Sequence, residues 1–169
     1  MPVTPFHGGV GLALKAVAGR RFSFVLFCCT QVAIDLESAY HLFRDEWPVH
    51  RFFHTFIGAA IASTVAVFGL RPAVTAVLRH LARRPDLQRW IGAPDISVGT
   101  AIVTAIVGCV GHVVPDAIMH ADVEPFAPFT STNPFHEALA VSTLHIALVV
   151  LGAVGFGMIV LSRRQRRER

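Results

Sequence analysis

Histidine and acidic residues gather in three short clusters, and each cluster lies at the end of an apolar stretch. The clusters are Asp35-Leu-Glu37, His50-Arg-Phe-Phe-His54 and His112-x-x-x-Asp116-x-x-x-His120. Imidazole and carboxylate groups together form a ligand set that suits zinc, iron or manganese. Ionisable side chains at the margin of a membrane span are costly to place there and usually have a function. The clusters therefore predict a metal centre built between membrane helices.

The third cluster has a four-residue spacing, which places His112, Asp116 and His120 on one face of a helix. Gly111 and Pro115 are expected to interrupt this helix, and such interruptions at membrane depth occur where a cavity or site is lined. The alternative is a helix end that carries interfacial polar residues.

The second cluster repeats the four-residue spacing, and Pro48 suits a helix start just before it. At least one of His50 and His54 is expected to be a ligand, and the spacing leaves open which one. The alternative is a pair of interfacial histidines beside Trp47 in an aromatic belt.

The first cluster holds two acids two residues apart, which point in nearly opposite directions on a helix. We expect one of them, preferably Asp35, to bind the metal. The other, Glu37, is expected to orient a histidine or to act as a general acid or base.

The elements that position these residues are membrane helices. Of the 169 residues, 53% are hydrophobic and only 15% are charged, against about 25% charged in a soluble domain. The sequence predicts an all-α fold, a single polytopic membrane domain over residues 1–169. About four transmembrane helices are expected, at 22–40, 52–70, 96–119 and 134–161.

Arginines concentrate in residues 71–95, a predicted basic cytoplasmic loop, and in residues 162–169, a predicted cytoplasmic tail. With four spans, the clusters then all lie on the non-cytoplasmic side. The net charge of +4 is explained by this asymmetry, so no nucleic-acid partner is expected.

Residues 8–19 are either a short or re-entrant helix that brings His7 to the clusters, or an amphipathic cytoplasmic helix with a solvated Lys15.

The order of these motifs resembles that of the YdjM-like inner-membrane metal-dependent hydrolases, over about residues 4–130. The resemblance rests on His7, Asp35-Leu-Glu37, His50-Arg-x-x-His54 and His112-x-x-x-Asp116. The chain departs from that family at Ile34, where the family usually has proline, and at Phe52, where it often has glycine. The resemblance implies a hydrolase of the bacterial inner membrane. A looser likeness in motif order, to zinc-dependent phospholipases C and single-strand nucleases, implies phosphoester hydrolysis.

These observations lead to a hypothesis with one or two divalent ions, zinc before manganese or iron. The expected ligands are Asp35, His50 or His54, His112 and Asp116, while His7 and His120 would complete a second site that Asp116 bridges.

In the same hypothesis Glu37 or Asp122 is the general acid or base, and Arg51 holds a phosphate oxygen. The expected substrate is an amphiphilic phosphoester, the expected partners are membrane lipids, and an oligomer is left open. Two alternatives are a non-catalytic metal-ion binding or transport protein and a membrane subunit whose polar cluster only locks helices together.

Overall fold

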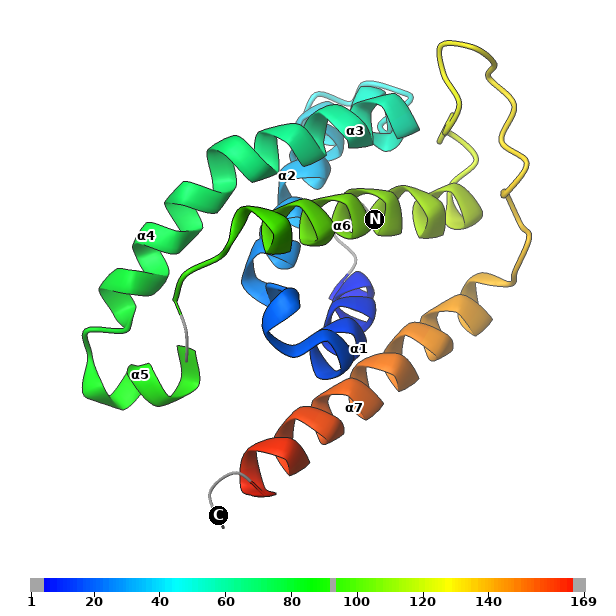
Figure 1. Ribbon diagram of the computed structural model, residues 1–169. Helices are drawn as coiled ribbons and strands as arrows, with labels where there is room; N and C mark the ends of the chain where they lie inside the picture. The colour runs from blue at the N-terminus through cyan, green and yellow to red at the C-terminus, as the bar shows by residue number, and fades with distance from the viewer. Residues whose placement is uncertain (1–4, 92–93, 166–169) are drawn as a thin grey trace.

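The computed structural model describes residues 5–91 and 94–165, and all regular secondary structure in these ranges is helical (Figure 1). The helices are α1 (Gly8–Ala18), α2 (Phe24–Phe43), α3 (Phe56–Val65), α4 (Arg71–Leu81), α5 (Pro85–Ile91), α6 (Val98–Met119) and α7 (Val141–Gln165). Short 3-10 turns occur at Pro5–His7, Gly19–Arg21 and Phe52–His54, and a π-helical segment at Ala66–Leu70 joins α3 to α4. The predicted all-α class is confirmed.

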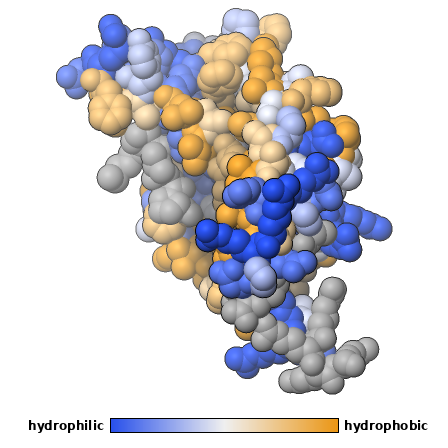
Figure 2. All heavy atoms as spheres, turned by 90° about the vertical axis from the view of Figure 1, so that its left-hand side faces the viewer, coloured by the Kyte–Doolittle hydropathy of each residue, from blue (hydrophilic) through white to orange (hydrophobic). Residues whose placement is uncertain are grey.

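Three helices in the described part of the chain are long and apolar enough to cross a bilayer: Phe56–Leu81, Val98–Met119 and Val141–Gln165. The first predicted span, 22–40, corresponds to α2, which is 20 residues long but is not among these three helices. Polar residues such as Gln31, Asp35 and Glu37 interrupt its apolar sequence. Figure 2 shows apolar surface lying between separate hydrophilic groups, as expected for a membrane protein.

The second span starts later and runs further than predicted. It begins at Phe56 because Thr55 caps it, with Oγ1 accepting a hydrogen bond from the Gly58 amide at 2.9 Å. The helix then passes through the π-helical segment into α4, so residues 71–81 of the expected basic loop are helical. In Figure 1, α3 and α4 form one long helix.

The last span begins at Val141, seven residues later than predicted at Pro134. The residues before it form no helix. Asn133 Nδ2 donates to the Ala117 carbonyl at the end of α6 at 2.8 Å, and Asn133 Oδ1 accepts from the Phe135 amide at 3.1 Å. The Glu137 amide also donates to the Ile118 carbonyl at 3.1 Å, and Glu137 has a φ of 60°, which an α-helix does not contain. The segment before α7 is therefore bound across the end of α6.

The predicted interruption of the third span is wrong, because α6 is continuous from Val98 to Met119 with Pro115 inside it. Proline removes one backbone donor, but only one further turn follows, and the remaining hydrogen bonds hold that turn. His120 does not belong to the helix. It ends the helix with φ −118° and ψ 123°, an extended conformation.

Small residues bring α2, α3 and α6 close together. Ala59, Ala101 and Ala105 are fully buried between them. A side chain at Gly108 would collide with the Thr30 hydroxyl of α2. This close approach, which small residues allow between membrane helices, lets Gln31 of α2 donate a hydrogen bond to the Gly108 carbonyl of α6 at 2.9 Å.

The N-terminal helix α1 packs mainly against α7 (Figure 1). The contact depends on glycines, since a Cβ at Gly9 would collide with the Leu148 carbonyl and one at Gly155 would lie 2.5 Å from the Ala13 nitrogen. Lys15 is half-buried. Its Nζ donates to the Gly19 and Phe22 carbonyls, each at 2.8 Å. This packing brings the start of α1, and with it His7, to the end of the bundle that holds the clusters.

The two ends of the bundle carry different residues. At one end Arg71 donates to the Ile96 carbonyl at 2.8 Å, and the Arg20 carbonyl accepts from Thr100 at 3.5 Å. At the other end, the loops after α2 and α6 meet, because the Phe56 amide donates to the Pro125 carbonyl at 2.8 Å. Arg20 and Arg71 therefore lie at the end opposite the histidine clusters, in agreement with the charge pattern of the sequence.

Candidate metal centre

Four buried side chains converge at the cluster end of the bundle. Their ligand atoms all lie within 4.8 Å of one another, and we call the set the four-residue cluster: Asp35, His54, His112 and Asp116. His112 Nε2 lies 3.1 Å from Asp116 Oδ2 and 3.2 Å from Asp35 Oδ1. His54 Nε2 lies 3.4 Å from Asp116 Oδ2. Two imidazoles and two carboxylates in this arrangement could hold a metal ion.

Each member is fixed by its own backbone. The four-residue spacing on α6 places His112 and Asp116 side by side. His54 ends a 3-10 turn, and the Glu37 carboxylate holds that turn by accepting from the Phe52 amide at 3.1 Å and the Phe53 amide at 2.8 Å. Glu37 of α2 therefore sets the position of His54, which lies in the connection between α2 and α3.

Gln31 orients His112, although sequence reasoning missed it. The Gln31 amide nitrogen must face the Gly108 carbonyl, which only accepts, so the amide oxygen faces His112 Nδ1 at 3.1 Å. An oxygen acceptor at this position requires the proton of the imidazole on Nδ1, which leaves Nε2 with its lone pair toward the cluster. The available signal was a polar residue in an apolar stretch, four residues before Asp35 on the same helix face.

Two further histidines have a carboxylate beside the ring. Glu37 Oε2 lies 3.8 Å from His54 Nδ1, and Asp122 Oδ1 lies 2.9 Å from His50 Nδ1. An oxygen on the outer nitrogen of a metal-binding histidine is the usual way in which proteins fix its tautomer and ring plane. Asp122 therefore orients the His50 ring through a hydrogen bond. Glu37 makes no hydrogen bond with the His54 ring and positions His54 through the Phe52 and Phe53 amides instead. The acid/base role expected for either acid stays a prediction.

The four-residue cluster does not satisfy its own polar atoms. His54 Nε2 and His112 Nε2 face each other at 3.3 Å, and at most one of them can donate to the other. Asp35 Oδ1 and Asp116 Oδ1 are buried and accept no hydrogen bond from the described residues. Such groups are costly when buried without a partner. A divalent cation between these groups would accept the nitrogen lone pairs and neutralise the carboxylate oxygens. The residues of the cluster therefore fit a metal ion.

His7 lies against the four-residue cluster, with Nε2 3.4 Å from Asp116 Oδ1. Neither ring nitrogen has a hydrogen-bond partner among the described residues. Burial lowers the pKa of His7 to about 4 despite the neighbouring Asp116, so its imidazole is neutral and keeps a free lone pair. The expectation that residues 8–19 bring His7 to the clusters agrees with this geometry.

The charge of the site favours a cation. Burial by itself would lower the pKa of His54, but the carboxylates of Asp116 and Glu37 outweigh burial and raise this pKa. The same negative potential that favours a proton on His54 favours a metal ion.

A second group comprises His50, His120 and Asp122, whose ligand atoms also lie within 4.8 Å of one another. The His50 ring lies 4.7 Å from the His54 ring and 4.4 Å from the His120 ring, centroid to centroid. Burial lowers the pKa of His50, and the hydrogen bond from His50 lowers the pKa of Asp122 although burial opposes it. This group adjoins the four-residue cluster.

The prediction that His50 and His54 share a helix is wrong. Residues 48–51 form a loop and His54 ends a 3-10 turn, so Pro48 starts no helix. The loop is held from a distance, because Asp122 Oδ2 accepts from the Val49 and His50 amides, each at 3.1 Å. Hydrogen bonds from backbone amides to distant carboxylates therefore position both histidines, with Asp122 holding the loop at His50 and Glu37 holding the turn at His54.

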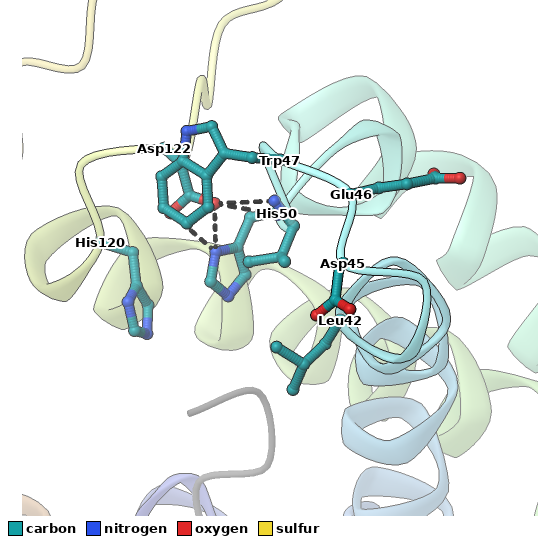
Figure 3. A pocket seen from close by; sticks show the side chains of 8 residues that line it. Leu42, Asp45, Glu46, Trp47, His50, His120 and Asp122 are labelled. Atoms are coloured by element: carbon teal, nitrogen blue, oxygen red, sulfur yellow. Dashed lines mark hydrogen bonds and ion pairs between the residues drawn. The ribbon is translucent and has the colours of Figure 1, made fainter.

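Arg51 lies outside both groups. Its Nε donates to the Pro48 carbonyl at 2.8 Å, and one terminal nitrogen lies 3.5 Å from Glu46 Oε2. The structure does not bring Arg51 to the four-residue cluster, so its phosphate-binding role stays a prediction. A pocket of about 540 Å³ opens beside His50, His120 and Asp122 instead (Figure 3).

No protein-family model, curated protein or solved structure matches the chain.

Proposed function

We propose that the protein is a membrane-embedded metal-dependent hydrolase that cleaves a phosphoester of a lipid or another amphiphile. The observation that carries the proposal is the four-residue cluster, a buried set of two histidines and two aspartates in which Asp35 Oδ1, Asp116 Oδ1 and His54 Nδ1 have no hydrogen-bond partner among the described residues. The motif order shared with the YdjM-like hydrolases supports the same activity. We propose zinc as the metal because histidine nitrogen and carboxylate oxygen are its preferred ligands besides cysteine.

The residues divide into three tasks. The four-residue cluster holds the ion. Gln31 orients His112, and Glu37 positions the turn that carries His54. A divalent ion at such a site supplies a Lewis acid for a phosphoryl oxygen and lowers the pKa of bound water toward ~7. The His50–Asp122 pair, hydrogen-bonded at 2.9 Å beside the pocket, can take up and return a proton.

The location of the cluster supports an amphiphilic substrate. The cluster lies at one end of a bundle whose helices are long enough to span a bilayer, and the adjoining pocket includes the apolar side chains of Leu42 and Trp47. We further propose that the arginine-rich end faces the cytoplasm of a bacterium. The centre then opens on the non-cytoplasmic side of the inner membrane.

The metal content of detergent-purified protein tests the proposal. We expect one or two equivalents of zinc in the wild type, and loss of zinc without loss of folded protein in His112→Ala and Asp116→Ala. His80→Ala is the matched control, since His80 is exposed on α4, and it should retain the metal. A panel of phosphoesters, with and without lipid tails, should then show hydrolysis only by the zinc-loaded proteins. Wild type that binds no zinc, manganese or iron after reconstitution contradicts the proposal.

Metal transport has less support. A transport path needs polar groups near the midplane with exits on both sides. Toward the arginine-rich end, apolar residues of α2, the π-helical segment, α6 and the loop before α6 fill the space between the helices: Leu26, Ala66, Val67, Ile96, Ala101 and Ala105.

A further inference from the structure

The pocket beside the metal centre has a distinct chemical character. It measures about 540 Å³ and is lined by Leu42, Asp45, Glu46, Trp47, Val49, His50, His120 and Asp122 (Figure 3). Three of these residues are acids, and none is a lysine or an arginine. The pocket reaches the metal centre through His50, whose ring lies 4.7 Å from that of His54. A group bound in the pocket would therefore lie next to the reacting centre.

Two of the three acids already have partners. Glu46 accepts from Arg44 Nε at 2.8 Å and lies 2.7 Å from His41 Nδ1. Asp122 accepts from His50. The Asp45 carboxylate makes no hydrogen bond or ion pair with any residue in the described part of the chain, and it lines the pocket. It is a negative charge available to a ligand.

The backbone at Asp45 is unusual for this residue type. The Asp45 amide donates to the Leu42 carbonyl at 3.1 Å and the Glu46 amide to the His41 carbonyl at 3.0 Å, which is the pairing that closes a helix C-terminus with a left-handed residue. Glycine is the usual residue at that position, but here Asp45 has a φ of 53°. A left-handed aspartate costs free energy relative to glycine, and such strain is often retained where a side chain has a function.

Two more lining residues are suited to a ligand. Trp47 is 74% exposed and presents its indole at the pocket. Indole faces attract ammonium groups, and such aromatic sites recognise choline-like ligands. His50 is only 5% exposed, and its Nε2 is buried without a hydrogen-bond partner among the described residues. The pocket thus combines an unpaired carboxylate, an open aromatic face and a buried polar atom.

We propose that this pocket binds the ammonium-bearing headgroup of a zwitterionic phospholipid. The ammonium group lies between the Asp45 carboxylate and the Trp47 indole, and the phosphate lies toward His50 and the metal centre. The placement of the phosphate rests on the proposed hydrolase function, whereas the ammonium site rests on the pocket alone. The described lining residues include three acids and no lysine or arginine, which disfavours headgroups with net negative charge.

Tryptophan fluorescence tests the ammonium site without requiring catalysis. The chain has two tryptophans, so Trp90→Phe leaves Trp47 as the reporter. We expect phosphocholine to change the fluorescence saturably and glycerol phosphate to bind at least tenfold more weakly. Asp45→Asn should weaken phosphocholine binding by about three- to tenfold. Asparagine tolerates the left-handed backbone, so thermal melting should show the variant folded. Glu124→Gln, which removes an exposed acid outside the pocket, should bind as the parent does.

Equal binding of phosphocholine and glycerol phosphate, or unchanged phosphocholine binding in Asp45→Asn, overturns the inference. Hydrolysis assays with phosphatidylcholine and phosphatidylglycerol in mixed micelles test the hydrolase activity separately from the headgroup site. Equal hydrolysis of both lipids, unaffected by Asp45→Asn, refutes the headgroup site and leaves the hydrolase intact. Phosphocholine binding that depends on Asp45, in a protein that binds no metal and hydrolyses neither lipid, supports the headgroup site and refutes the hydrolase.

Discussion

Replacing Gln31 by leucine removes the oxygen that orients His112 while keeping a side chain of similar size. In the wild type the amide oxygen lies 3.1 Å from His112 Nδ1, and the amide nitrogen donates to the Gly108 carbonyl at 2.9 Å. Without the oxygen, the His112 ring loses its fixed tautomer and plane. Loss of such an outer partner costs 10- to 100-fold in metal affinity, or about 1.4–2.8 kcal/mol.

The same substitution also leaves the Gly108 carbonyl without its donor, at a cost of about 1–3 kcal/mol in stability. Gln31→Glu separates the two effects. Glutamate keeps an oxygen for His112 but cannot donate to Gly108, so it should lower stability and leave metal affinity close to that of the wild type. Leucine should lower both.

Zinc affinity is measured by competition with a chromogenic chelator in detergent, and stability by thermal melting of the metal-free proteins. Zinc affinity of Gln31→Leu within twofold of the wild type would refute the argument that Gln31 orients His112. An equal loss of affinity in both variants would show that Gln31 acts only through helix packing.

Three further predictions concern the helix contact, the loop and the metal. Gly9→Ala should destabilise the fold by about 1–3 kcal/mol, since the new methyl group meets the Leu148 carbonyl; Gly157→Ala, with open space around it, should be neutral or stabilising in thermal melts. Asp122→Asn should lower the melting temperature at pH 7. Because the pKa of Asp122 is lowered in the fold, its stabilisation exists above the ordinary carboxyl pKa and is lost as the pH falls through the lowered value; a difference from the wild type that does not narrow below about pH 4 would contradict this. Free zinc at a hundredfold excess over its Kd should restore about 2.7 kcal/mol of stability to chelator-treated wild type and none to His112→Ala.

Local spacing was sufficient to predict part of the site. His112 and Asp116 belong to one helix, so their separation by four residues places them side by side whatever the rest of the chain does. Asp35 also follows from its place in a helix, because the opposite acid, Glu37, points elsewhere. The all-α class followed from the low charge together with apolar stretches long enough to cross a bilayer as helices.

The loop histidines could not be positioned in this way. The chain around His50 and His54 takes its shape from the carboxylates of Asp122 and Glu37. Asp122 lies 72 or 73 residues away from the amides that it binds, and Glu37 lies 15 or 16 residues away. A four-residue spacing without a helix has no geometric meaning. The late start of α7 has the same cause, since the segment before it is hydrogen-bonded to the end of α6 through Asn133 and Glu137.

The packing of the first helix against the last affects the order in which the molecule can assemble. During synthesis α1 emerges before α7, so α1 lacks its main helix contact until Val141–Gln165 has been made. The four-residue cluster comes from segments between Asp35 and Asp116 and can form before that point, whereas His7 cannot be fixed beside Asp116 until α7 arrives. We therefore expect a nascent chain released before α7 to take up zinc more weakly than the finished protein, so that the final helix completes the centre without contributing any of the four residues of the cluster.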